Sequence, residues 1–498
     1  MEGMSEHARP AAAVEHRQRP SSPAFRAFIA SGWSARGTAL PEPLPAASST
    51  AARRARLSAL LAGERLVVPA GVLRVRSNDT DYRFRAHSAF AWLTGLGCHA
   101  EPDSVLVLEP VPGGGHEALL FVRPRAERSE EEFYADARYG ELWVGPRPTL
   151  REVEALTGIS ARHLDTLRDA VAKDVGPDGL RVRVVRGADP AADEYVYGAR
   201  TSAGGTPVDG EADDVELARL LSELRLVKDA FEVAQLRRAV EATARGFADV
   251  VRALDGAVGA RGERVVEIAF ESRARLEGNG VGYDTIAAAG HHACTLHWIR
   301  NDGPVSEGDL VLLDAGVEVD TLYTADVTRT VPVSGRFTAG QRQVYDLVLE
   351  AADAAFEAAR PGRTFRELHE AAMRVIAGRL AEWGWLPASA EESLTPEGQF
   401  HRRWMVHGTS HHLGLDVHDC AQARRELYLD GVLEEGMVFT IEPGLYLMPD
   451  DELVPAELRG IGVRIEDDVL VTAAGCVNLS AMLPRRADEV EAWMASLR

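Results

Sequence analysis

Basic residues are in the minority in this chain of 498 residues, which carries 55 Lys and Arg against 76 Asp and Glu and has a formal net charge of −21. Surfaces that bind nucleic acid or anionic membranes need clustered basic residues, so this balance argues against both kinds of partner. The sequence also lacks any run of about 18 consecutive apolar residues, the length from which a membrane-spanning helix is considered. We therefore expect no nucleic acid and no membrane among its partners.

Cysteine is scarce as well. The four cysteines are dispersed along the chain and form no CxxC pair. This spacing indicates neither a disulfide framework nor a zinc-thiolate site. The apolar patches near the N-terminus are too short for the core of a secretory signal. We expect reduced cysteines and a cytoplasmic location.

The composition that remains is typical of a globular protein with several domains. Hydrophobic residues make up 46% of the chain and charged residues 26%, which is ordinary for a protein with a sizeable core. Composition changes predict a loosely ordered extension at 1–50, an N-terminal domain at 51–200, a linker at 201–221 and a large C-terminal domain at 222–498. The linker prediction rests on a stretch that is rich in Gly, Pro and acidic residues and nearly free of apolar ones.

Local patterns predict strands and helices in both domains. Two apolar runs, 104–108 and 118–122, flank a glycine-rich turn and predict a β-hairpin. Thr338 and Thr364 each stand three residues before a Gln or Glu, which is the capping-box pattern of a helix start. Apolar β-like runs occur between and after these helices, so the C-terminal domain is expected to be α+β.

An internal repeat in the C-terminal domain places acidic residues at strand ends. Residues 307–316, EGDLVLLDAG, align with residues 435–444, EGMVFTIEPG, and each copy runs from a turn through a short apolar strand to a carboxylate. A second acidic residue follows each copy in a β-rich stretch. Two such half-domains packed face to face bring four carboxylates to a common centre: Asp314, Asp326, Glu442 and Glu466.

Four carboxylates in one apolar pocket need positive charge beside them. Like charges within a few ångströms raise each other's pKa, and burial adds to the cost of ionisation. Metal cations resolve this conflict, and a nearby histidine cluster offers nitrogen ligands. The cluster consists of His407, His411, His412 and His418, with His297 as a weaker candidate further upstream.

One histidine with four carboxylates is an oxygen-rich ligand set, which suits Mn²⁺ better than a structural zinc ion. Shared carboxylates imply two ions a few ångströms apart, and such a pair supports metal-assisted hydrolysis. The motifs of competing chemistries, HExxH, GxSxG, the P-loop and a GxGxxG after a strand, are not found. The residues themselves predict a two-metal hydrolase and leave its substrate open.

Three stretches resemble a known family. Residues 76–95, 405–419 and 459–469 are similar to motifs of Xaa-Pro aminopeptidase, also called aminopeptidase P, a family of dinuclear metallopeptidases with the pita-bread fold of methionine aminopeptidase. The resemblance runs from about residue 55 to the C-terminus. It implies a creatinase-like N-terminal α/β domain, followed by a pita-bread catalytic domain with an internal pseudo-twofold repeat.

The resemblance also implies a role for each site residue. The implied metal ligands are Asp314, Asp326, His411, Glu442 and Glu466, of which Asp326 and Glu466 bridge two ions. The substrate is surrounded by His297, His407 and His418. Glu442 also takes a proton from the attacking water and later gives it to the leaving amine, while His418 hydrogen-bonds the scissile carbonyl or its oxyanion. Arg464 lies beside Glu466 and keeps it ionised.

One spacing departs from the family pattern. Asp326 follows Asp314 by 12 positions, one more than the family usually has. We expect a hairpin turn around 318–321 to absorb the additional residue, because a turn tolerates a change of length better than a strand. Ligation by both aspartates is then expected to survive.

These implications give a function hypothesis with its alternatives. The expected enzyme is a cytoplasmic aminopeptidase with two divalent metal ions, Mn²⁺, that releases the first residue of peptides with proline in second position. Its expected assembly is a homodimer or homotetramer. The nearest alternative is a prolidase restricted to Xaa-Pro dipeptides, which shares the fold and the ligands. A non-catalytic binding protein on the same scaffold is a distant alternative, because every ligand position is filled.

Overall fold

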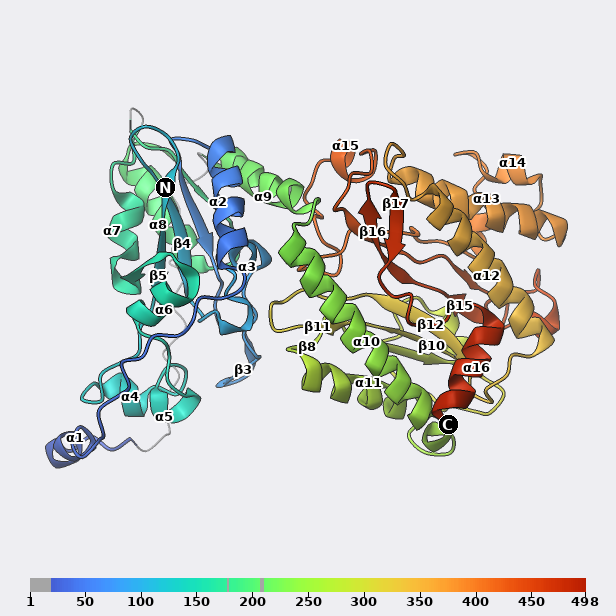
Figure 1. The fold of residues 1–498 in the computed structure, drawn as a ribbon, viewed down its shortest axis with the longest axis horizontal. Helices are drawn as coiled ribbons and strands as arrows, with labels where there is room; N and C mark the ends of the chain where they lie inside the picture. Colours follow the sequence, from blue (N-terminus) through green and yellow to red (C-terminus); the bar gives the residue numbers. More distant parts are fainter. Residues whose placement is uncertain (1–18, 177–178, 207–209) are drawn as a thin grey trace, which may run out of the picture.

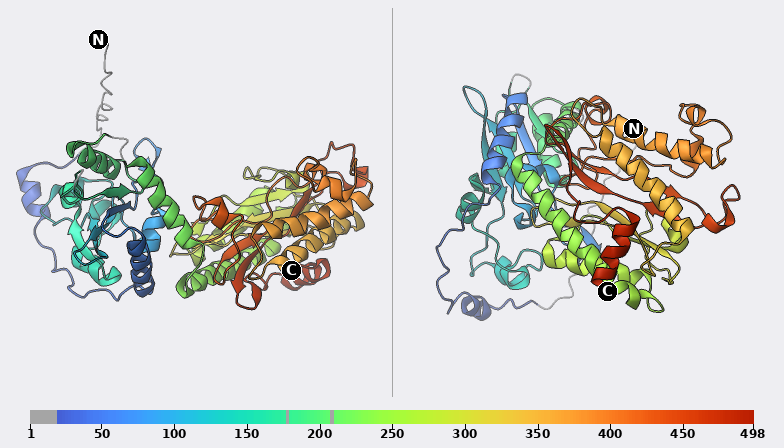
Figure 2. Two further views of the ribbon diagram at one scale, coloured as in Figure 1. Left: turned by 90° about the horizontal axis from the view of Figure 1, so that it is seen from above. Right: turned by 45° about the vertical axis from the view of Figure 1, so that its right-hand side comes forward.

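The protein consists of an N-terminal and a C-terminal part that lie side by side (Figure 1). The computed structural model describes residues 19–176, 179–206 and 210–498, so residues 1–18 of the predicted extension lie outside the described residues. Helices α9 (Glu211–Arg225) and α10 (Ala230–Ala257) lead from one part into the other (Figure 2). Within the described ranges, no helix combines the length and the apolar character needed to cross a membrane.

A five-stranded mixed sheet in the order β6-β5-β4-β1-β7 forms the centre of the N-terminal part. The predicted hairpin is confirmed, because β4 and β5 pair antiparallel along their whole length. Strands β1 to β7 are Arg65–Pro69, Val75–Ser77, Thr80–Asp81, Val105–Pro110, His116–Val122, Ser160–His163 and Val182–Val184. Helices α1 to α8 are Pro23–Ile29, Ala47–Leu60, Ser88–Thr94, Glu131–Ala135, Glu141–Val144, Leu150–Thr157, Leu167–Ala172 and Pro190–Ser202, with short 3-10 turns η1 at Gly97–His99 and η2 at Leu164–Thr166.

Within the predicted extension, residues Pro23–Ile29 form a helix that the composition did not predict. Ser22 caps helix α1 by accepting a hydrogen bond from the Phe25 backbone N–H. The ring of Phe25 then packs edge-on against Tyr134, with ring centroids 5.2 Å apart, and Trp33 packs in the same way against Phe133. A few aromatic contacts with residues about a hundred positions away hold this segment, and such contacts leave no periodic signal in the sequence.

The predicted linker also differs from the structure. Residues 207–209 lie outside the described residues, but α9 begins at Glu211, so the second half of the predicted linker is helical. Its acidic first turn, which suggested a solvated connection, instead matches the positive end of the helix dipole. Asp214 in that turn forms a buried ion pair of 2.6 Å with Arg200, and Leu217 and Leu221 are buried below it.

Two three-stranded antiparallel sheets, β12-β10-β9 and β13-β16-β17, form the core of the C-terminal part. Strand β10 pairs with β12 in the way that β13 pairs with β16, so the predicted repeat is also a structural one. Strands β8 to β17 are Gly280–Val281, Ile286–Ala289, Leu310–Ala315, Val317–Glu318, Val327–Pro332, Val438–Ile441, Gly444–Tyr446, Gly462–Arg464, Asp467–Thr472 and Gly475–Asn478. This duplicated α+β arrangement is the predicted pita-bread fold.

Helices cover the two sheets from outside. Helix α10 packs on α11 and α12 packs on α13, and the strands lie between these pairs (Figure 1). Helices α11 to α16 are Glu263–Glu277, Ala339–Ala358, Arg366–Glu382, Ala390–Ser393, Arg425–Tyr428 and Ala487–Leu497, with 3-10 turns η3 at Gly290–Cys294, η4 at Phe400–Arg403 and η5 at Ala456–Leu458.

The two predicted capping boxes have different outcomes. At the start of α12, Thr338 and Gln341 form both reciprocal hydrogen bonds, so this box is confirmed. The box predicted at Thr364 is only half formed. The Glu367 carboxylate accepts the Thr364 backbone N–H at 2.6 Å, but α13 begins after Phe365 and no side chain caps it.

Candidate active site

The carboxylates of the repeat lie at matching positions of the two sheets. Asp314 is in β10 and Asp326 directly precedes β12, while Glu442 directly follows β13 and Glu466 directly precedes β16. The register pairs Ala315 with Val327, and Ile441 with Asp467, so each acidic pair is at the end of an antiparallel ladder. The duplicated fold thus turns a sequence repeat into one cluster of acids.

The nine side chains to which the resemblance assigns a role line one cavity of about 510 Å³, whereas His412 of the histidine cluster does not line it. They are Asp314, Asp326, Glu442, Glu466, His297, His407, His411, His418 and Arg464. Asp314, Asp326 and Glu466 are buried, while Glu442 is partly exposed to the cavity. The structure therefore brings the complete set together, and the role of each member stays a prediction.

Three of these residues form a compact group of potential metal ligands. One ligand atom each from Asp326, His411 and Glu466 lies within 4.8 Å of the other two. His411 Nε2 is 3.2 Å from Asp326 Oδ2 and 3.6 Å from Glu442 Oε1, which adds a fourth donor. An imidazole nitrogen surrounded by carboxylate oxygens fits a divalent transition-metal ion.

The electrostatics of the cavity show an excess of negative charge. Burial raises the pKa of Glu466 well above its usual range, and the charges of Asp326 and Glu442 add to the rise. Burial also raises the pKa of Glu442 to about 7. Burial alone lowers the pKa of His411, but the hydrogen bond to Asp326 and the charge of Glu442 outweigh it and raise the value to about 9. Cations bound here remove this conflict, because they favour the ionised carboxylates.

Arg464 is the cation among the cavity residues, and its direct partner differs from the prediction. Its Nη2 donates to Asp314 Oδ2 at 2.6 Å, and its Nε donates to Thr328 Oγ1 at 3.1 Å. Thr328 in turn donates to Glu466 Oε2 at 2.6 Å. The guanidinium was expected beside Glu466, where it keeps this carboxylate ionised. Within the described chain it pairs directly with Asp314 and is connected to Glu466 by hydrogen bonds through Thr328, while its charge acts to lower the pKa of Glu466 against the larger effect of burial.

Histidines form the opposite wall of the cavity. His407 Nε2 lies 2.8 Å from the Tyr446 hydroxyl, and burial together with the charge of Arg464 lowers the pKa of His407 to about 3. The rings of His411 and His418 meet edge to face with centroids 4.4 Å apart. Burial and the charge of His411 lower the pKa of His418. Their environment in the cavity thus favours the neutral form of both imidazoles.

Tyr283 is a site residue that the sequence analysis missed. Its hydroxyl lies 2.6 Å from Asp314 Oδ1 and within hydrogen-bond distance of Asp326 Oδ1, so its single O–H donates to one or the other and links the two aspartates of the first half-domain. The tyrosine precedes β9 and has no counterpart in the repeat. No sequence pattern distinguished it from the other tyrosines of the chain.

Replacing Tyr283 by Phe is expected to weaken metal binding by roughly tenfold, because partners of ligating carboxylates orient the ligands. The measurement is the Mn²⁺ concentration that restores half of the peptidase activity after chelation. Tyr323→Phe is the matched control: Tyr323 is a buried tyrosine whose hydroxyl donates to Glu232 at 3.0 Å, away from the cavity carboxylates. Equal metal affinities of the two variants would show that Tyr283 does not orient the ligands.

Glu263 fixes the segment that carries His297. This buried carboxylate accepts the backbone N–H groups of Ala289 at 2.8 Å and Gly303 at 2.6 Å and the indole N–H of Trp298 at 2.8 Å. His292 Nδ1 lies 2.7 Å from the same carboxylate, and its ring stacks on Trp298. These four contacts with one buried carboxylate thus hold both ends of the segment 289–303, which carries His297 in the wall of the cavity.

Glu263→Gln is expected to raise KM for a tripeptide substrate roughly tenfold and to lower the free energy of unfolding by about 2 kcal/mol. The amide NH₂ of the glutamine faces donors where the carboxylate offered acceptors, so two hydrogen bonds are lost. Steady-state kinetics and denaturant unfolding measure the two effects. The control is Glu267→Gln, one helical turn later, because among the described residues Glu267 accepts a single side-chain hydrogen bond, from Asn301 Nδ2 at 3.0 Å. An unchanged KM in Glu263→Gln would contradict the positioning of His297 by this acid.

The segment between the two aspartates forms a hairpin turn in the region where the additional residue was expected. Glu318 and Thr324 form an antiparallel bridge, and the Val319 backbone N–H donates to the Tyr323 carbonyl at 3.0 Å. The tip of the turn contacts the N-terminal part, where the Cys98 N–H donates to the Asp320 carbonyl at 2.8 Å. Because the tip faces η1, the longer turn leaves Asp314 and Asp326 in contact with Tyr283.

Fold and site together are those of a metallopeptidase, and comparisons with known proteins agree. The pattern of metallopeptidase family M24 matches residues 234–473, and that of the aminopeptidase P N-terminal domain matches residues 50–180. Xaa-Pro aminopeptidase 1 of Streptomyces coelicolor is 54% identical over 94% of this chain and 91% of its own length. Xaa-Pro aminopeptidase 2 of the same organism is 52% identical over 94% of this chain and 95% of its own length.

A solved structure gives the same answer. The Pseudomonas aeruginosa aminopeptidase PepP is 34% identical and superposes with a TM-score of 0.78, over 92% of this chain and 99% of that one. The chain therefore belongs to the Xaa-Pro aminopeptidases of metallopeptidase family M24, enzymes that release the N-terminal residue of a peptide when proline follows it. The aminopeptidase hypothesis is thereby confirmed over the prolidase and the non-catalytic alternatives.

Proposed function

We propose that the active-site cavity holds two divalent metal ions and that Mn²⁺ is the native metal. The proposed ligands are Asp314, Asp326, His411, Glu442 and Glu466, with Asp326 and Glu466 shared by both ions. The observation that carries this proposal is the convergence of ligand atoms from Asp326, His411 and Glu466 within 4.8 Å. The dominance of carboxylate oxygen over nitrogen supports Mn²⁺.

Residues of the chain itself hold the substrate and move the protons. When bound, the metal ions polarise the scissile carbonyl and lower the pKa of the attacking water. Glu442, the one cluster carboxylate that is partly exposed to the cavity, accepts a proton from that water and returns it to the proline nitrogen of the leaving group. His418 donates a hydrogen bond to the scissile carbonyl oxygen, where negative charge develops. His297 and His407 line the substrate position.

Proline after the scissile bond explains the need for a dedicated enzyme. The nitrogen of the scissile bond is the ring nitrogen of proline, which carries no hydrogen and cannot donate the hydrogen bond of an ordinary peptide. The proposed substrates are accordingly peptides with proline at position two. Reconstitution of the chelated enzyme with Mn²⁺, Co²⁺ or Zn²⁺, followed by hydrolysis of Ala-Pro-Ala, tests the metal. Highest turnover with Mn²⁺ supports the proposal, and no turnover with any of the three ions refutes it.

A homodimer or homotetramer is proposed as the assembly. Leu142, Trp143 and Val144 support it, because helix α5 leaves all three apolar side chains more than half exposed. Light scattering of the purified enzyme decides between this and a monomer.

A cytoplasmic location is also proposed. Its support is that all four cysteines are free thiols, as a reducing compartment keeps them. Fractionation of expressing cells measures it, and recovery of the enzyme outside the cytoplasm refutes it.

A further inference from the structure

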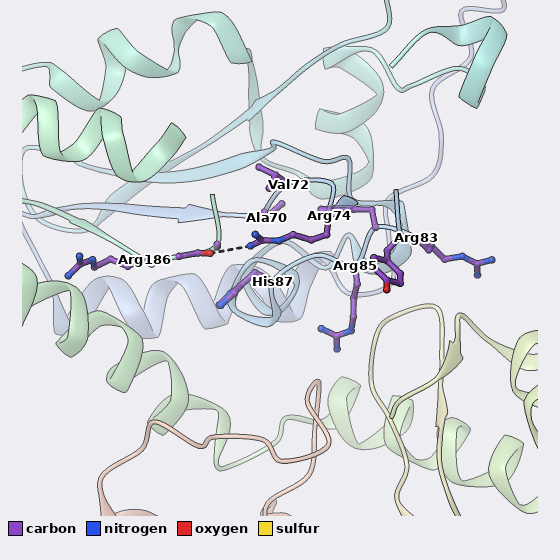
Figure 3. Close-up of a pocket in the computed structure, with 12 residues that line it drawn as sticks. Ala70, Val72, Arg74, Arg83, Arg85, His87 and Arg186 are labelled. Carbon is purple, nitrogen blue, oxygen red and sulfur yellow. Dashed lines mark hydrogen bonds between the residues drawn. The ribbon is translucent and has the colours of Figure 1, made fainter. Parts of the chain in front are cut away.

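Arg85 connects the N-terminal part to the catalytic part at the active site. It lines a pocket of the N-terminal part together with Arg74, Arg83 and Arg186. Figure 3 shows that these guanidinium groups do not converge: Arg83 and Arg186 point to opposite ends, and Arg85 points away from the sheet, toward the neighbouring segments below it. The contacts of the Arg85 guanidinium with these neighbouring segments explain its direction.

The guanidinium of Arg85 contacts two segments of the catalytic part. Its Nε donates to Glu318 Oε2 at 2.6 Å, and its Nη2 donates to the Leu415 carbonyl at 2.5 Å. Glu318 is buried and lies on the hairpin between Asp314 and Asp326. Leu415 lies three residues before His418. One side chain of the N-terminal part therefore holds both the hairpin and the segment that leads to His418.

A second contact from the N-terminal part acts on the same segment. The hydroxyl of Ser88, at the start of α3, donates to Asp416 Oδ1 at 2.5 Å. Residues 414–418 belong to no helix or strand, so no regular backbone ladder fixes their path. Their conformation depends on single contacts such as these, and the two neighbours Leu415 and Asp416 are both held from across the junction.

His418 lies between two cavities. It lines the active-site cavity, and it also lines a second cavity of about 460 Å³ at the junction, whose walls include Arg85, Ser88 and Asp416. A shift of the 414–418 segment toward the second cavity would meet open space rather than packed atoms. The position of the His418 ring is therefore not secured by packing alone.

We propose that Arg85 is a positioning residue for the peptidase reaction, which fixes the His418 ring in the active-site cavity through the Leu415 carbonyl and Glu318. The proposal rests on the role of His418 under the proposed function. Arg85 itself does not line the active-site cavity. The N-terminal part thus supports catalysis from outside, and displacement of a catalytic group by about 1 Å is enough to cost up to a hundredfold in rate.

A double-mutant cycle tests this coupling in the full-length, Mn²⁺-loaded enzyme with Ala-Pro-Ala as substrate. Arg85→Gln is expected to lower kcat/KM roughly tenfold when His418 is present and less than about twofold in a His418→Ala background. Arg83→Gln is the matched control, because Arg83 lines the same pocket and, within the part of the chain that the structure describes, donates its one hydrogen bond to the Asn279 carbonyl at 3.1 Å. Its kcat/KM is expected to match that of the parent enzyme.

Two further outcomes separate this proposal from the one it rests on. If the fold-loss of kcat/KM in the double variant equals the product of the fold-losses in the two single variants, the two residues act independently. This result overturns the coupling, even when each single variant is impaired. Full activity of His418→Ala refutes instead the role assigned to His418. If Arg85→Gln fails to fold, Ser88→Ala replaces it, because this change removes the bond to Asp416 and the 3.3 Å bond from Arg85 Nη1 but keeps the Arg85 contacts with Glu318 and Leu415. Its smaller loss must also vanish in the His418→Ala background, and a persisting loss overturns the proposal.

Discussion

Glu442→Gln is expected to lower kcat for Ala-Pro-Ala by about a thousandfold, because the variant loses a metal ligand and the group that takes the proton from water. Glutamine has nearly the same size and keeps one carbonyl oxygen, so the fold is expected to stay intact. The partial exposure of Glu442 to the cavity puts its carboxylate within reach of a bound substrate, in contrast to the buried Asp326 and Glu466. Steady-state kinetics at saturating Mn²⁺ measures the effect.

The control for this variant is Glu435→Gln, in the turn that enters the same strand β13. Glu435 is exposed, and the change removes one negative charge as Glu442→Gln does. Its kcat is expected to match that of the parent enzyme. A Glu442→Gln enzyme that keeps a tenth or more of kcat at full metal occupancy contradicts the proton-transfer role.

Chelation of the metal is expected to abolish turnover and to lower the thermal unfolding midpoint of the catalytic part by about 5 °C or more. Five carboxylates line the cavity, the four of the acidic cluster and Asp284, and its lining residues include only one arginine. Metal ions that bind the folded site but not the unfolded chain raise the free energy of unfolding. The increase grows with the ratio of the free metal concentration to Kd. Calorimetry of the chelated and the Mn²⁺-loaded enzyme measures the difference.

The matched variant for the chelation experiment is Asp326→Asn. It removes one negative charge from the centre of the cluster, so the chelated variant is expected to unfold at a higher temperature than the chelated parent enzyme. The response of its midpoint to Mn²⁺ is expected to fall sharply. An identical response of variant and parent enzyme to Mn²⁺ would show that Asp326 is not a ligand.

The acidic cluster could be predicted because its information is local. Each copy of the repeat contains an apolar strand with a carboxylate at its end, and the antiparallel register then carries both acids of each half to one edge. Alternation along an extended segment also separates neighbouring histidines. His411 faces the cavity, while His412 is fully buried on the other side and stacks on Phe365 at 4.6 Å.

Residues that act through distant partners could not be predicted. Tyr283 and Glu263 hold ligands and cavity walls through single hydrogen bonds, and neither belongs to the repeat or to a periodic pattern. The direct partner of Arg464 could not be predicted for the same reason. Thr328 comes to lie between the guanidinium and Glu466 through folding, and no local sequence pattern indicates this. At the start of α9, the polar composition suggested a linker. The buried ion pair of Asp214 with Arg200 joins residues of two different helices, so a short stretch of sequence does not reveal it.

The number of metal ions bound per active chain tests the two-metal centre most directly. Elemental analysis of the enzyme after Mn²⁺ loading and removal of free metal is to be compared with its turnover of Ala-Pro-Ala. The proposed ligand set predicts two equivalents per chain at full activity, and activity that falls with each equivalent withdrawn. Full activity with one equivalent or none would contradict it.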